Sequence, residues 1–145
     1  MTINTYDLKS SIVTINGVPI TGFGEGDVID IEYAEEQFKL HVGAIGETSR
    51  SRINNSSGKS MLKIKQSSLA NSSLQTLFDA DLLSGTGTFI FILTAPDGYK
   101  FVCNDSFITK HPKHSYGKEE KDRDWEIAHP KIVSSALQVL DTFGV

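Results

Sequence analysis

Two alternating segments stand back to back between residues 29 and 42, and they constrain the fold more than any other feature. Successive side chains of a strand point to opposite faces, so the apolar residues of each segment share one face. Four residues separate the segments, which predicts a β-hairpin. In that pairing Glu32 lies opposite Lys39. Asp30 lies opposite His41, so charge favours the same register. The apolar residues are Ile29, Ile31 and Tyr33, then Phe38, Leu40 and Val42.

The polar segment at residues 43–58 predicts a long loop. Long loops on a rigid sheet usually bind something. Arg50 and Arg52 join Lys59 and Lys63 in a cationic patch, which either keeps the surface soluble or docks on an acidic patch of another copy. We predict an extended inter-subunit loop whose contact residues are Glu47, Thr48, Ser49, Arg50, Arg52, Asn54 and Asn55.

One helix is predicted at about residues 73–83, where the apolar residues change from alternating to helical spacing. Ser72 and Gln75 form a capping-box pattern at its start, and Gly85 ends it. The apolar residues at helical spacing are Leu74, Leu77, Phe78 and Leu82.

Short strands account for most of the remaining chain. Asn16-Gly17 predicts a tight hairpin turn. Residues 86–94 are apolar on both faces, so this strand is central or covered by a neighbouring subunit. Eight or nine strands and one helix predict a mainly β domain over residues 1–145. The expected architecture is an antiparallel β-sandwich or partly closed barrel with one flanking α-helix. Residues 131–145 are expected to form a C-terminal arm, either a short helix or a docking segment.

Composition narrows the function classes. The 145 residues suffice for one domain with a real core. A net charge of −4 argues against a protein that grips nucleic acid through its phosphates. The lone Cys103 is expected to be a small buried hydrophobe. The N-terminus lacks a signal-peptide pattern, and the longest apolar run, residues 89–93, is too short for membrane insertion.

No constellation of catalytic groups is visible, so we expect a protein that is not an enzyme and uses no cofactor. His111 and His114 flank Pro112 without a completing ligand, so no metal site is expected. Adjacent carboxylates such as Glu119 and Glu120 point apart in a loop and do not form an acid–base pair. The glycines at residues 22–26 lack dinucleotide-loop spacing and favour a bend in the sheet.

Several motifs resemble the tail tube proteins of contractile-tailed bacteriophages, over roughly residues 15–130. Gly-Phe-Gly-Glu-Gly-Asp at 22–27 precedes the alternating strand that ends at Tyr33, and Val-Gly-Ala-Ile-Gly-Glu-Thr-Ser-Arg-Ser follows at 42–51. Later motifs keep the family's order. They are Gln-Ser-Ser-Leu-Ala-Asn at 66–71, Phe-Ile-Thr-Lys at 107–110 with Pro112, and Gly-Lys-Glu-Glu-Lys at 117–121 running into Asp124-Trp125.

The resemblance implies a β-sandwich or barrel with a flanking helix that forms hexameric rings, stacked head to tail into a hollow tube. It implies a sheath around the tube, a tape-measure protein, baseplate proteins, and DNA that passes through without specific binding. It places the chain in the virion tail, assembled in the host bacterial cytoplasm. Tubes of R-type bacteriocins and type VI secretion systems share that architecture, so a bacteriocin or secretion device is an alternative. A monomeric β-sandwich that binds a ligand is a second one.

Physical reasoning agrees with a tube. A ring closes by rotation, whereas stacking along its axis is open-ended, and exposed strand edges then serve as joints. Six copies at −4 each carry a formal charge of about −24, which would repel DNA phosphates from a channel wall. Our candidates for residues facing the lumen are Asp30, Glu32, Glu35 and Glu36.

Overall fold

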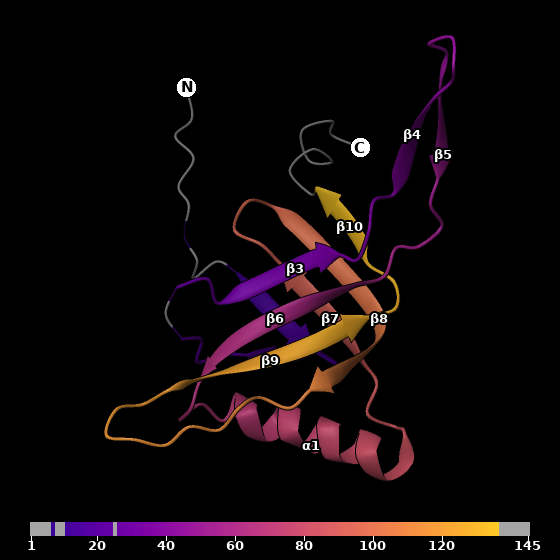
Figure 1. The fold of residues 1–145 in the computed structure, drawn as a ribbon. Coiled ribbons are helices and arrows are strands. Elements are labelled where there is room, and N and C mark those ends of the chain that lie inside the picture. Colours follow the sequence, from indigo (N-terminus) through magenta and orange to yellow (C-terminus); the bar gives the residue numbers. More distant parts are fainter. Residues whose placement is uncertain (1–6, 8–10, 25, 137–145) are drawn as a thin grey trace, which may run out of the picture.

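The computed structural model describes residue 7 and residues 11–24 and 26–136 (Figure 1). The described part is mainly antiparallel β with a single helix, which confirms the predicted fold class. The elements are β1 (Ile12–Ile15), β2 (Val18–Ile20), β3 (Ile29–Tyr33), β4 (Phe38–Val42), β5 (Thr48–Arg52), β6 (Gly58–Lys65), α1 (Ala70–Ser84), β7 (Phe89–Thr94), β8 (Tyr99–Lys110), β9 (Asp122–His129) and β10 (Val133–Ala136).

One bent sheet makes both layers of the fold. Its strand order is β2-β1-β7-β8-β9-β6-β3, with β10 paired to β8. The first part of β8 pairs with β7 and β10, and its last part pairs with β9. Asp105, with φ 57°, lies within the register shift between Cys103 and Ser106, and a second shift follows between Ile108 and Lys110. Such irregularities bend a strand, so β8 can pass from one layer to the other without closing a barrel.

The core lies between the layers. Phe91, Leu62, Ile64 and Ile127 are fully buried, and Trp125 is 1% exposed. Cys103 is also fully buried, as predicted, and burial raises the pKa of its thiol to about 11. The strand predicted at 86–94 occurs as β7 and is central, because it pairs with β1 on one side and β8 on the other.

The tight turn at Asn16-Gly17 is confirmed. Asn16 and Gly17 have φ of 52° and 81°, the left-handed values that a two-residue hairpin loop requires. The Asn16 carboxamide oxygen also accepts a hydrogen bond from the Ile90 amide at 2.9 Å, which ties the turn to β7.

The helix is longer than predicted, and its start differs. It begins after Leu69, whose side chain makes no capping hydrogen bond, so the predicted capping box at Ser72 is wrong. The Ala70 amide donates to the Ser68 hydroxyl at 3.2 Å at the actual start, and the Asn71 side-chain amide donates to the Lys65 carbonyl at 2.8 Å, which holds α1 against the end of β6. The predicted end is confirmed: Gly85 is left-handed, and its N–H donates to Asp81 at 2.9 Å.

The hairpin predicted between residues 29–33 and 38–42 is wrong. β3 pairs with β6, so Glu32 lies opposite Lys59 and Asp30 opposite Met61. β4 pairs with β5, which lies within the predicted loop at 43–58. Alternation decides which residues of a strand share a face, but it does not choose the partner strand. The sequence of β5, TSRSR, has no apolar residue and therefore lacks a strand signal.

The C-terminal segment is described only in part. Val133–Ala136 form β10 against the first half of β8. The predicted arm beyond residue 136 lies outside the described residues.

His129 makes a buried polar cluster within this core. Its Nε2 lies 2.5 Å from the Ser60 hydroxyl, and its Nδ1 lies 2.7 Å from the Ser106 hydroxyl. The ring packs on Phe91 at 4.8 Å between centroids. Burial lowers the pKa of His129 to about 4, because the imidazolium would be cut off from water.

We therefore expect the free energy of unfolding to fall as the pH is lowered, because His129 is protonated more readily in the unfolded chain than in the native state. Below pH 6.5 the unfolded chain takes up a proton that the native state refuses until about pH 4. Stability is thus complete above pH 6.5 and is lost as the pH falls toward 4. Between pH 7 and pH 5 the loss should be about 1 to 2 kcal/mol, allowing for partial solvent screening. Urea unfolding should show that His129→Gln removes this slope, whereas His41→Gln on the surface keeps it. An unchanged slope in His129→Gln would contradict the assignment.

Candidate functional site

The β4–β5 hairpin projects from the body of the sheet (Figure 1). Every residue of both strands is exposed. Their register pairs Phe38 with Arg52, Leu40 with Arg50, and Val42 with Thr48. The hairpin is therefore an independent two-stranded ribbon, and such ribbons are only marginally stable alone in water.

The two faces of the hairpin differ in chemistry. One face carries Phe38, Leu40 and Val42, which are 51%, 68% and 66% exposed. The Arg50 guanidinium lies 4.7 Å from the centre of the Phe38 ring, a cation–π contact on that face. The opposite face is polar: the His41 ring nitrogen Nε2 lies 2.9 Å from the Ser51 hydroxyl. Burying the apolar stripe together with Ile45 in a partner would contribute about 5 kcal/mol. An exposed apolar stripe of this kind marks an interaction surface.

A hydrogen-bond network holds the base of the hairpin. The Gln37 amide donates to the Asn55 carbonyl at 2.8 Å, and the Asn55 amide donates to Glu35 Oε1 at 2.9 Å. The Ile53 amide donates to the Gln37 carbonyl at 2.8 Å and extends the ladder toward the body. These bonds set the direction in which the hairpin projects.

The tip of the hairpin is a tight turn. The Gly43 amide donates to the Glu47 carbonyl at 2.7 Å, and Gly46 has φ 89°, which favours glycine. The exposed Glu47 side chain folds back over Gly43. Ile45 is 91% exposed at the tip and continues the apolar stripe.

The structure brings the predicted contact residues together on this hairpin. Thr48, Ser49, Arg50 and Arg52 lie on β5, and Glu47 lies in the turn. Asn54 is exposed just after β5. Asn55 differs, because its side chain is used in the base network and also accepts from Ser57. Their contacts with another subunit remain a prediction.

Sequence reasoning missed the apolar half of the surface. Phe38, Leu40 and Val42 were predicted to share one face but were not among the predicted contact residues, and the structure exposes them. A usable signal was present, since Gly43 and Gly46 can close a turn that pairs residues 38–42 with 48–52.

The lumen candidates lie in two places. Asp30 and Glu32 alternate with the inward residues of β3 and are exposed, and Glu32 lies 3.9 Å from the Lys59 ammonium. Glu35 and Glu36 are exposed between β3 and β4, beside the hairpin base. The four carboxylates therefore follow one edge of the body, although Glu35 is held by Asn55.

Within the described residues, no group of three His, Cys, Asp or Glu side chains is placed to hold a metal ion. No described helix has the length and apolar character needed to cross a membrane.

Comparison with known proteins identifies the family. The sequence profile described as "Bacteriophage PhiTE tail tube protein" matches residues 1–136. The chain belongs to this tail tube family. Members are structural proteins of phage tails and not enzymes. The curated "Structural protein ORF10" of Pseudomonas phage KPP10 is similar, with 27% identity over 112 residues. That alignment covers 75% of this chain and 65% of ORF10, so the chain spans less than two thirds of that relative.

Solved structures share the fold of this tail tube protein at low identity. A chain in the sheath/tube terminator of the extracellular contractile injection system PVC has a TM-score of 0.63 and 11% identity, and 94% of this chain and all of that chain are covered. A chain in the PVC sheath-tube complex has a TM-score of 0.61 and 10% identity. That match covers 91% of this chain and 92% of the PVC chain. A chain in the anti-feeding prophage tube-terminating cap has a TM-score of 0.61 and 12% identity. That match covers 94% of this chain and 92% of the cap chain.

Proposed function

We propose that this tail tube protein is the repeating subunit of the tube, forming hexameric rings that stack into a channel for DNA. The observation that carries the proposal is the β4–β5 hairpin, whose apolar stripe has no cover among the described residues of its own chain. An exposed apolar stripe of this kind marks a surface that a partner covers. A repeated structural protein can supply that partner as another copy of itself.

Further partners follow from the same role. A contractile sheath around the tube, baseplate proteins at its end and a tape-measure protein inside it are proposed neighbours. The structures with the same fold come from a PVC sheath-tube complex and from tube-terminating proteins, which supports the first of these. Assembly is proposed to take place in the host bacterial cytoplasm. The family match supports a phage tail over an injection device.

We also propose that Asp30, Glu32, Glu35 and Glu36 face the lumen. Their carboxylates are exposed on one edge, as a wall that must not bind DNA requires. Glu32 keeps only a long, exposed contact to Lys59, so replacing it costs the fold little.

Electron microscopy of the concentrated protein tests both proposals. The native chain is expected to form hollow tubes with six-fold rings that exclude short fluorescent duplex DNA at low salt. The variant with Asp30→Asn, Glu32→Gln, Glu35→Gln and Glu36→Gln is expected to form the same tubes but retain DNA, because the repulsive charge is gone. Neutralisation of four other exposed carboxylates, Asp79, Asp105, Glu119 and Asp122, is the matched control. Protein that remains monomeric at high concentration would instead support a ligand-binding module. Tubes that still exclude DNA after neutralisation would remove only the lumen assignment.

A further inference from the structure

The layer formed by β1, β7, β10 and the first part of β8 carries an apolar row on its outer face. Four residues that pair directly in register make up this outer row: Thr14, Ile92, Val102 and Val133. Val13, Phe91 and Cys103, next to them in the chain, point into the core and are buried, so the row points outward. Val133 is 51% exposed, and Ile12 and Ile90 beside the row are 52% and 46% exposed. The described residues therefore leave apolar side chains in water across four adjacent strands.

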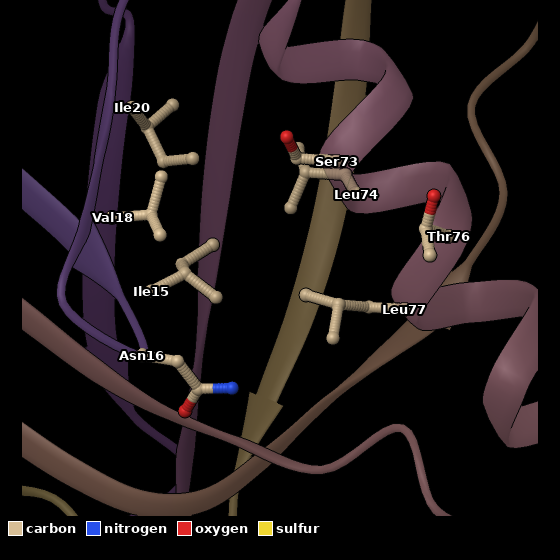
Figure 2. A pocket seen from close by; sticks show the side chains of 8 residues that line it. All are labelled: Ile15, Asn16, Val18, Ile20, Ser73, Leu74, Thr76 and Leu77. Atoms are coloured by element: carbon tan, nitrogen blue, oxygen red, sulfur yellow. The ribbon is translucent and has the colours of Figure 1, made fainter.

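The other surfaces of the sheet have a cover or carry charge. Figure 2 shows Ile15 and Ile20 on the inner side of the β1–β2 hairpin pointing toward Leu74 and Leu77 of α1. The outer face of β3, β6 and β9 meets solvent mainly with charged side chains. They are Asp30, Glu32, Lys59, Lys63, Asp124 and Glu126. By contrast, the outward residues of β1, β7, β10 and the first part of β8 include one charge, on Lys100. A sheet face so short of charge is typical of a covered face and not of one that water solvates.

The segment at residues 137–145 follows directly from this layer. β10 lies at an edge, where its described residues pair with β8, and the chain leaves the sheet at Ala136, just beyond Val133. The segment is rich in apolar residues, namely Leu137, Val139, Leu140, Phe143 and Val145. Its only charged residue is Asp141. Side chains of this kind gain free energy when an apolar surface takes them out of water.

The length of the segment suits the outer face. From β10 to β1 the outer row crosses three strand spacings, about 14 Å at about 4.8 Å each. Ala136 lies about 10 Å further along β10 than Val133, at about 3.4 Å per residue. The residues at 137–145 reach about 30 Å when extended. The segment can therefore turn back at Ala136 and cross the whole row.

Charge and connectivity favour this occupant over a second copy. Asp141 supplies the opposite charge to Lys100, which makes no ion pair with a described carboxylate. Lys100 pairs in register with Ser135, one residue before β10 ends, so it lies close to the start of the segment. A segment joined directly to the sheet has an effective concentration of about a millimolar. A second copy in dilute solution competes poorly with it.

We propose that residues 137–145 fold back over the outer row of their own chain. Their apolar side chains cover Ile92, Val102 and Val133. Asp141 then lies beside Lys100. The inference goes beyond the proposed function, because it concerns the free subunit and needs no second copy. The surface that this layer offers to other proteins is then the segment and not the bare sheet.

Disulfide formation in dilute protein tests the contact. Leu140→Cys with Val102→Cys is expected to form a bridge within one chain at pH 8 at least about 10-fold faster than a matched control pair. The control combines Leu140→Cys with Glu32→Cys, an exposed position on the opposite layer. The Tyr33 hydroxyl next to it lies 2.9 Å from the Ser134 hydroxyl, so a segment that binds no surface reaches both positions. Peptide mass spectrometry of samples taken over time measures the two rates.

The outcomes of this experiment are distinct. Cys103 does not compete, because it is buried and its pKa is raised to about 11. Equal rates for the two pairs would overturn the proposal. Bridges between chains in place of bridges within a chain would also overturn it, and would assign the outer row to a second copy.

Dye binding decides where the cysteine variants fail to fold. Leu140→Ser with Phe143→Ser should release the segment and raise the fluorescence of ANS, which binds exposed apolar surface, at least about twofold. Adding Ile92→Thr and Val133→Thr should remove most of this rise, because the uncovered row is then less apolar. Adding Leu40→Ser on the β4–β5 hairpin in their place should leave the rise unchanged. No rise, or a rise that survives the changes in the outer row, would overturn the proposal.

Discussion

Replacing residues 38–52 by Asn-Gly is expected to abolish tube assembly and leave a folded monomer. Gln37 and Ile53 are joined by a backbone hydrogen bond of 2.8 Å, so a two-residue turn can close the ladder at this point. The excised strands pair only with each other, and their side chains are exposed. The free energy of unfolding of the monomer should therefore change by less than about 0.5 kcal/mol. Sizing chromatography measures the oligomeric state, urea unfolding measures the free energy of unfolding, and electron microscopy shows whether tubes form.

The faces of the hairpin provide a matched control for this experiment. Leu40→Ser with Val42→Ser removes the apolar stripe and should reduce assembly as the truncation does. Lys39→Ser with His41→Ser changes the polar face and should retain tubes. Normal tubes from the truncated chain would show that the hairpin is not the joint between copies. Equal losses from both faces would show that the hairpin acts through its fold and not through its stripe.

Asn71→Asp is expected to destabilise the monomer strongly. The buried Asn71 amide donates to the Lys65 carbonyl at 2.8 Å, and its oxygen accepts from the Trp125 indole at 2.9 Å. It thus joins α1, β6 and β9. An aspartate keeps the shape and the acceptor but loses the donor, and it places a charge among carbonyl oxygens. Loss of a buried hydrogen bond with an unpaired charge should cost about 3 kcal/mol.

Urea unfolding followed by Trp125 fluorescence measures this loss, because the only tryptophan is the partner of Asn71. Asn54→Asp, the same change at an exposed position, should change the free energy of unfolding by less than about 0.5 kcal/mol. Equal midpoints for the two variants would show that the Asn71 network does not stabilise the fold. The stability difference between Asn71→Asp and the native chain should shrink as the pH falls toward 4, because the introduced carboxyl becomes protonated and can donate again.

Local signals predicted the parts of the fold that depend on neighbouring residues. The Asn16-Gly17 turn and the Gly85 helix end occur as expected, because both need left-handed backbone that these residues tolerate. Cys103 is buried as predicted for a lone cysteine, and β7, with apolar residues on both faces, takes the first of its two predicted places, the centre of the sheet. The helix start was not predicted, since the Ala70 and Asn71 amides donate to the Ser68 hydroxyl and carbonyl, four residues before the predicted cap at Ser72.

The candidate site was predicted in position but not in structure. The contact residues lie on a projecting element, as expected, but β5 was taken for a loop because its residues are polar. Glu32 shows the same limit: its charge suits Lys39 or Lys59 equally, and the chain pairs it with Lys59. Pairing with β6 buries Leu62 and Ile64 in the core, and a local hairpin with β4 offers no comparable burial.

By itself the sequence determined the face alternation of each strand, the left-handed turns and membership of a tail tube family, because each depends on residue types close together in the chain. Only the tertiary structure decided which strands pair, and hence that the stripe of Phe38, Leu40 and Val42 faces water. Partner choice is a competition among distant segments for buried apolar area, and its outcome exists only once the whole chain has folded.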